Sequence, residues 1–83
     1  MRTGKIVISL SGHDVGRIYL VVNQDDNYLY VCDGKEHRLN KPKRKNKKHI
    51  GQIFEEKYYE PSQMTDGALR KLLSALTDEM NVS

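Results

Sequence analysis

The side chains of this 83-residue chain that are most able to do chemistry are cations, and they gather in one segment. Residues 35–50 contain eight Lys and Arg residues and a single acid, so the segment carries +7, while the whole chain carries +3 and the remainder −4. Within it, Lys41–Lys48 has six cations and no acid. Lys and Arg side chains neutralise phosphates and release counterions. The charge pattern therefore predicts contact with a polyanion.

Other kinds of site have little support in the sequence. The adjacent acids at 25–26 and 55–56 would point to opposite faces of a strand, or face solvent in a turn, so neither pair predicts acid–base catalysis. The three histidines lack a spacing that would bring two of them together with a carboxylate. Cys32 is the only cysteine, which excludes an internal disulfide, and we expect a core thiol there. We expect no enzymatic activity, no cofactor and no metal site.

The elements that position the cations are predicted to be short strands. Alternating and β-branched residues mark three of them, at Lys5–Leu10, Gly16–Asn23 and Tyr28–Cys32. Asp33-Gly34 is a strong hairpin signal and predicts Lys35–Leu39 as the returning strand. His49–Phe54 recovers apolar character and could add a last strand. Strands spaced by about 8–12 residues favour a small all-β barrel over a βαβ unit.

The basic segment itself is predicted to be irregular. Lys41–Lys48 contains no apolar residue apart from Pro42, which breaks regular structure, and its like charges repel one another. We therefore expect a loop or an extended arm in the absence of a ligand. A solvated linker and, in a eukaryotic source, a nuclear import signal are the alternative interpretations.

The C-terminal stretch changes to a helical period. Its apolar residues predict one face of a helix at about Asp66–Met80, with Thr65 or Asp66 as N-cap. A single helix of this length is marginal alone, so its leucine face must pack on something. That face either docks on the open end of the barrel or contacts a partner protein, and it is formed by Leu69, Leu72, Leu73 and Leu76.

Five tyrosines raise the question of base stacking. In a small domain without Trp most tyrosines simply pack, and packing is the main expectation here. Strand alternation puts Tyr28 and Tyr30 on the same face as Cys32. Tyr19 lies off the face of Ile18 and is expected to be exposed.

The glycine-bounded first hairpin resembles a known family. Gly4, the pair Ile6-Val7, Ser11-Gly12, Gly16 and the apolar run to Val22 look like the KOW motif of large-subunit ribosomal proteins and transcription elongation factors. The block Leu29–Gly34, followed by basic residues, is similar to the ribosomal branch grouped as fourteen-e, six-e and twenty-seven-e, and to short stand-alone bacterial KOW proteins. The resemblance implies an SH3-like barrel that binds RNA, commonly ribosomal RNA.

These observations combine into one prediction. The fold is expected to be mainly β, with an SH3-like KOW barrel over residues 1–54 that includes the basic arm, and a connector and amphipathic helix over 55–83. The function expected is RNA binding in the translation apparatus, in the cytoplasm and associated with ribosomes. Gly12 is expected to permit a left-handed turn, and Gly16 a close backbone approach where the loop returns to the sheet. A loop whose backbone can approach a partner closely suits contact with phosphates and sugars. The candidate RNA-binding residues are Gly12, His13, Gly16, Arg17, Lys35, Arg38, Lys41, Lys43, Arg44, Lys45, Lys47 and Lys48.

A second function class stays open. The barrel could be a protein-interaction module of a transcription or translation factor, with the leucine helix as the partner surface and the basic arm serving solubility. A membrane role is not expected, because the longest apolar stretch, Ile18–Val22, is far shorter than a membrane span. The N-terminus also carries no apolar signal segment, so nothing favours export.

Overall fold

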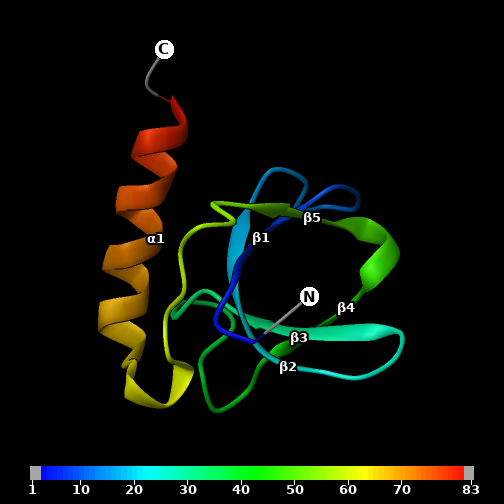
Figure 1. The fold of residues 1–83 in the computed structure, drawn as a ribbon, viewed down its shortest axis with the longest axis horizontal. Coiled ribbons are helices and arrows are strands. Elements are labelled where there is room, and N and C mark those ends of the chain that lie inside the picture. The colour runs from blue at the N-terminus through cyan, green and yellow to red at the C-terminus, as the bar shows by residue number, and fades with distance from the viewer. Residues whose placement is uncertain (1–2, 82–83) are drawn as a thin grey trace.

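Five antiparallel strands form one sheet in the order β4–β3–β2–β1–β5, and a single helix lies beside it (Figure 1). The computed structural model describes residues 3–81; the predicted domain ranges also include Met1, Arg2, Val82 and Ser83, which lie outside the described residues. The predicted fold class, mainly β with one C-terminal helix, is confirmed. The elements are β1 (Ile6–Ser9), β2 (Ile18–Gln24), β3 (Tyr28–Cys32), β4 (Lys43–Asn46), η1 (Lys47–His49), β5 (Ile50–Ile53), η2 (Pro61–Gln63) and α1 (Asp66–Asn81).

The sheet is curled into a small barrel, as the connection between its two edge strands requires. In a flat sheet β4 and β5 would lie four strand spacings apart, about 19 Å. They are joined only by η1, three residues of 3-10 helix that rise about 2 Å each. The sheet must therefore bend until its edges approach, and Figure 1 shows the strands arranged around a central space.

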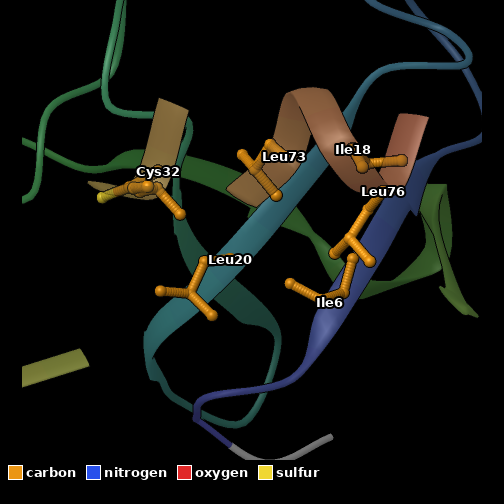
Figure 2. Close-up of a cluster of buried hydrophobic side chains, with 7 residues drawn as sticks. Ile6, Ile18, Leu20, Cys32, Leu73 and Leu76 are labelled. Carbon is orange, nitrogen blue, oxygen red and sulfur yellow. The ribbon is translucent and has the colours of Figure 1, made fainter. Parts of the chain in front are cut away.

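Both faces of the central strands are buried, and each face has its own apolar cluster. The inner face of the barrel is filled by Val7, Tyr19, Val21, Leu29, Val31 and Ile50. On the outer face, α1 covers β1, β2 and the Cys32 end of β3, and its leucines Leu73 and Leu76 lie against Ile18, Leu20 and Ile6 (Figure 2). The continuous apolar run in β2 is the sequence signature of this double burial.

Tyr19 is 1% exposed, so the expectation of an exposed ring at this position is wrong. Its side chain lies on the inner face of β2, where the barrel interior replaces solvent. Cys32 is fully buried under the helix, as predicted for a core thiol.

The structure shows which residue caps the helix and where the leucine face of the helix packs. Thr65 is its N-cap, because the Thr65 hydroxyl accepts a hydrogen bond from the Ala68 N–H at 3.1 Å. Leu69, Leu73 and Leu76 are buried in the cluster that also contains β1 and β2 residues, and Leu72 packs against its margin. The leucine face is therefore occupied by the sheet, and its interpretation as a surface for a partner protein is not supported by this arrangement.

The segment after β3 differs from the predicted hairpin. Residues 35–39 form bends and a turn rather than a strand. The cause is the Asp33 carboxylate, whose Oδ1 accepts the backbone N–H groups of Lys35 and His37, both at 2.9 Å. Gly34 has a φ of 77°, and a Cβ at this position would lie against the Asp66 carbonyl at the start of α1. The strand that pairs with β3 is instead β4, which begins after the end of β3 with the ten residues 33–42 between them.

The basic segment Lys41–Lys48 does not form the loop or extended arm that was predicted. Its central residues, 43–46, form β4, which pairs with β3 in the register Val31↔Lys43 to Tyr28↔Asn46. A strand separates like charges, because successive side chains point to opposite faces. Mutual repulsion of the cations therefore does not prevent a strand at residues 43–46.

Candidate nucleic-acid interface

A buried carboxylate, Asp14, organises the basic strand. Asp14 lies in the β1–β2 loop and is 9% exposed. Its Oδ1 lies 2.9 Å from the Lys45 Nζ, and its Oδ2 lies 3.3 Å from the Lys43 Nζ. The Ser9 hydroxyl donates to Oδ1 at 2.9 Å and the Tyr19 hydroxyl donates to Oδ2 at 2.7 Å. Two cations and two hydroxyls thus converge on one carboxylate, which ties the edge strand β4 to the loop between β1 and β2.

The electrostatics of this cluster favour the ionised carboxylate. Burial alone would raise the pKa of Asp14, but the hydrogen bonds from Lys45, Tyr19, Ser9 and Lys43 together outweigh it and hold the pKa well below its ordinary value. Burial, and then the hydrogen bond to Asp14, raise the pKa of Tyr19 far above its ordinary value. The Asp14 carboxylate is therefore ionised at neutral pH.

The alternation of β4 divides its cations between two environments. Lys43 and Lys45 lie opposite Val31 and Leu29 in the register, and so share the inner face of the barrel. The Lys45 side chain is only 9% exposed and the Lys43 side chain 35%. Both were predicted to bind RNA; the structure pairs them with Asp14 instead, and Lys45 has almost no surface left for an external phosphate.

Arg44 points the other way and is exposed. It lies opposite Tyr30 in the register, and its guanidinium carbon is 4.5 Å from the centroid of the Tyr28 ring. A cation at this distance over an aromatic face makes a cation–π contact. The Arg44 guanidinium thus lies over the Tyr28 ring and is also exposed, so that an anion can reach it.

The remaining cations of the basic segment fall into two groups. Lys47 and Lys48 lie on η1, which is held beside the β2–β3 turn by a hydrogen bond from the Lys47 N–H to the Asn27 carbonyl at 3.0 Å. Lys35, Arg38 and Lys41 lie in the loop between β3 and β4, and are exposed. This loop runs near the start of α1, because the Arg70 guanidinium donates to the Gly34 carbonyl at 2.8 Å. These five cations therefore come from two parts of the fold, the β3–β4 loop and η1.

Six of the predicted cations form no ion pair within residues 3–81: Lys35, Arg38, Lys41, Arg44, Lys47 and Lys48. Of these, only Lys47 is partly buried. No acid in the described residues pairs with these six cations, so their charge is not neutralised within the domain.

The β1–β2 loop presents four predicted contact residues to solvent: Gly12, His13, Gly16 and Arg17. Gly12 has the left-handed backbone that was predicted, with a φ of 92°. Gly16 was expected to permit a close backbone approach, but nothing lies within 4 Å of the place where its Cβ would be. Its φ of 88° is the property that requires glycine. Arg17 lies 3.6 Å from Glu36, and both side chains are more than half exposed.

Asp14 is not among the residues that the sequence predicted for the site. Its side chain contacts no backbone N–H in the turn and reaches instead across the barrel to residues 29 and 31 positions away along the chain. One signal in the sequence points towards it: it is the sole acid in the loop between two strongly apolar strands. An acid at such a position needs a counter-charge when the loop packs down.

Within the described residues 3–81, no group of three or more His, Cys, Asp or Glu side chains is arranged to hold a metal ion, and no pocket is present. None of the helical segments described has the length and apolarity to cross a membrane. Burial raises the pKa of the Cys32 thiol to about 12, with smaller contributions from Asp66 and Asp33.

Comparison with known proteins finds no matching protein-family model and no matching curated protein.

Proposed function

We propose that this protein binds RNA in the translation apparatus, and that its contact is with ribosomal RNA. The observation that carries the proposal is the set of six cations without an ion pair in residues 3–81, next to two lysines of the same segment that are paired internally. If charge in this segment served only solubility, no particular cation would need to be sequestered and no other left free. The resemblance of the first hairpin to KOW domains supports RNA as the polyanion and the ribosome as its setting, and implies a cytoplasmic, ribosome-associated, non-enzymatic protein.

The mechanism proposed is electrostatic capture. Exposed lysines and arginines exchange their counterions for phosphates, which gives affinity that depends strongly on salt. Five such contacts give a log–log salt slope of about −3.5 to −4.5. The Asp14 cluster contributes indirectly, because it fixes β4 and thereby the direction in which Arg44 points.

The test is the salt dependence of binding to purified ribosomal RNA for two matched double variants. Lys47→Ala/Lys48→Ala removes the two η1 cations, of which Lys48 is exposed and Lys47 partly buried, and we expect the salt slope to become shallower by about 1.4–1.8. Lys57→Ala/Lys71→Ala removes the same charge from the connector and α1, and we expect the slope to stay within about 0.5 of the wild type. Equal effects of the two variants, or no binding by the wild type at low salt, would refute the proposal.

A second readout is co-sedimentation with ribosomes. We expect the wild type to pellet with ribosomes at low salt and to be released at high salt. If it remains in the supernatant under both conditions and instead forms dimers, the protein-interaction alternative replaces the RNA-binding one.

A further inference from the structure

We propose that Tyr28, Tyr30 and Arg44 form a stacking site for unpaired bases, so that the RNA recognised at this surface is single-stranded. This inference rests on the proposed function and adds to it the class of RNA. The three residues, called here the β3–β4 outer face, are brought together by the pairing of β3 with β4.

The two rings are on the outside of the barrel and are not part of its core. Leu29 and Val31, which alternate with them along β3, are fully buried on the inner face. Tyr28 and Tyr30 share the opposite face with Cys32, but α1 covers only the Cys32 end of the strand. Neither tyrosine belongs to, or packs against, either apolar cluster. The usual explanation for a tyrosine in a small domain, packing, accounts for Tyr19 and Tyr59 and leaves these two unexplained.

Tyr28 and Tyr30 are each partly buried, and polar contacts hold their side chains in place. The Tyr30 hydroxyl donates to Asp25 Oδ2 at 3.0 Å, and Asp25 Oδ1 accepts the N–H groups of Asn27 and Tyr28 at 3.0 and 2.8 Å. These backbone hydrogen bonds, with smaller contributions from Tyr30 and Lys47, keep the pKa of Asp25 below its ordinary value. Arg44 rests on Tyr28. Rings and guanidinium planes fixed before binding lose little conformational freedom when a base stacks on them.

The charges around the site suit a nucleic-acid strand. The turn between β2 and β3 and the η1 segment lie together on the side of the molecule away from α1 (Figure 1). Arg44 on β4 contacts the Tyr28 ring, and Lys47 and Lys48 follow β4 on η1, which is hydrogen-bonded to the β2–β3 turn. Asp25 and Asp26, both exposed in the β2–β3 turn, would repel phosphates. The phosphates must then pass on the β4–η1 side, with the bases turned towards the tyrosines.

Single-stranded RNA fits this arrangement better than a duplex does. Aromatic and guanidinium planes on an open sheet face stack bases that are splayed out, whereas the bases of a duplex are already stacked and paired. The depth of an A-form major groove also keeps side chains from its base edges. A proline-rich peptide is the other ligand that aromatic surfaces on small barrels bind, and the three adjacent cations favour phosphates over it.

The experiment compares three probes of equal length: a 12-nucleotide oligouridine, a 12-nucleotide abasic ribose-phosphate chain and a 12-base-pair RNA duplex. The abasic chain keeps the phosphates and removes the stacking partners. We expect the wild type to bind oligouridine at least about fivefold more tightly than the abasic chain. Tyr28→Val/Tyr30→Val, which replaces the rings by β-branched residues of high strand propensity, should lose that preference and keep the salt slope. Tyr28→Phe/Tyr30→Phe should retain the preference, since its rings remain.

Two controls locate the effect. Tyr58→Val removes an exposed ring on the connector and should leave the preference for oligouridine unchanged. In the unmutated protein, photocrosslinking of a 5-iodouridine oligomer should label Tyr28 or Tyr30, which avoids any question of misfolding. The inference is overturned if oligouridine and the abasic chain bind equally, if the duplex binds more tightly than oligouridine, if Tyr58→Val removes the preference, or if the rings are needed only for a proline-rich peptide. Salt-dependent binding to ribosomal RNA without base preference would overturn this inference alone; no binding to any RNA would overturn the proposed function as well.

Discussion

The Lys45 ammonium lies 2.9 Å from the Asp14 carboxylate, although 31 residues separate the two along the chain. This contact converts part of a highly basic segment into a buried structural pair. It also sets the strand alternation that leaves Arg44 on the outer surface. The same segment thus contains cations that build the domain and cations that form no ion pair within residues 3–81.

Replacing the carboxylate should be costly. Asp14→Asn leaves Lys45, with a side chain only 9% exposed, without its counter-charge. Removal of one partner from a buried pair costs about 3–5 kcal/mol, and the partial exposure of Lys43 places the expected loss at about 3 kcal/mol of unfolding free energy. Urea denaturation measures it. The matched control is Asp26→Asn in the exposed β2–β3 turn, which should change the unfolding free energy by less than about 0.5 kcal/mol. Equal stabilities of the two variants would contradict the structural role of Asp14.

Acid should destabilise the wild type more than it destabilises Asp14→Asn. The folded-state pKa of Asp14 is lowered, so its contribution to stability is complete above the unfolded-state pKa of about 4 and is lost as the pH falls below it. Thermal unfolding at pH 7, 5, 4, 3 and 2 should show the two proteins converging in stability only below about pH 4. Convergence between pH 7 and 5 would mean that another group carries the pH dependence.

Two glycines with similar backbone angles should respond differently to substitution. At Gly16 the space for a Cβ is open, so Gly16→Ala should cost only the left-handed strain, about 1–2 kcal/mol. At Gly34 a Cβ would also collide with the Asp66 carbonyl, so Gly34→Ala should cost more and loosen the β3–β4 loop from α1. Denaturation of both variants measures the difference. A loss at Gly34 no larger than that at Gly16 would show that the loop does not depend on close packing against the helix.

The leucine face of α1 should matter for stability and not for self-association. Leu73→Ala opens a cavity between the helix and the sheet, and we expect a loss of about 2–5 kcal/mol. Met80→Ala, at a residue 40% exposed near the end of the helix, is the control and should cost less than about 1 kcal/mol. Analytical ultracentrifugation of the wild type should show a monomer. A dimer that dissociates on Leu73→Ala would assign this face to a partner instead.

Features encoded locally could be predicted from the sequence. The alternation in Tyr28–Cys32 and the double-sided apolar run in β2 defined two strands, and the spacing of the leucines with Thr65 as cap defined α1. The location of β4 could not be obtained in this way, because its four polar residues have no strand signal of their own. It is held by pairing with β3 and by a carboxylate in the first loop.

In the candidate site, too, local features could be predicted from the sequence and features that depend on long-range pairing could not. The sequence identified which residues are cations and placed Tyr28 with Tyr30 on one face of a strand, and that placement is confirmed. It could not separate Lys43 and Lys45 from Arg44, because their separation depends on which face of β4 meets the barrel interior. Tyr19 was misplaced for a related reason: its hydroxyl finds a buried acceptor in Asp14, which local alternation does not reveal.

The most direct test of the central claim is a backbone-amide NMR titration of the full chain with oligouridine at low salt. We expect the largest chemical-shift changes in residues 28–30 and 44–48, and none beyond the noise along residues 70–81 of α1. Changes concentrated on α1, or no changes at any site at millimolar RNA, would contradict the assignment of this surface to RNA.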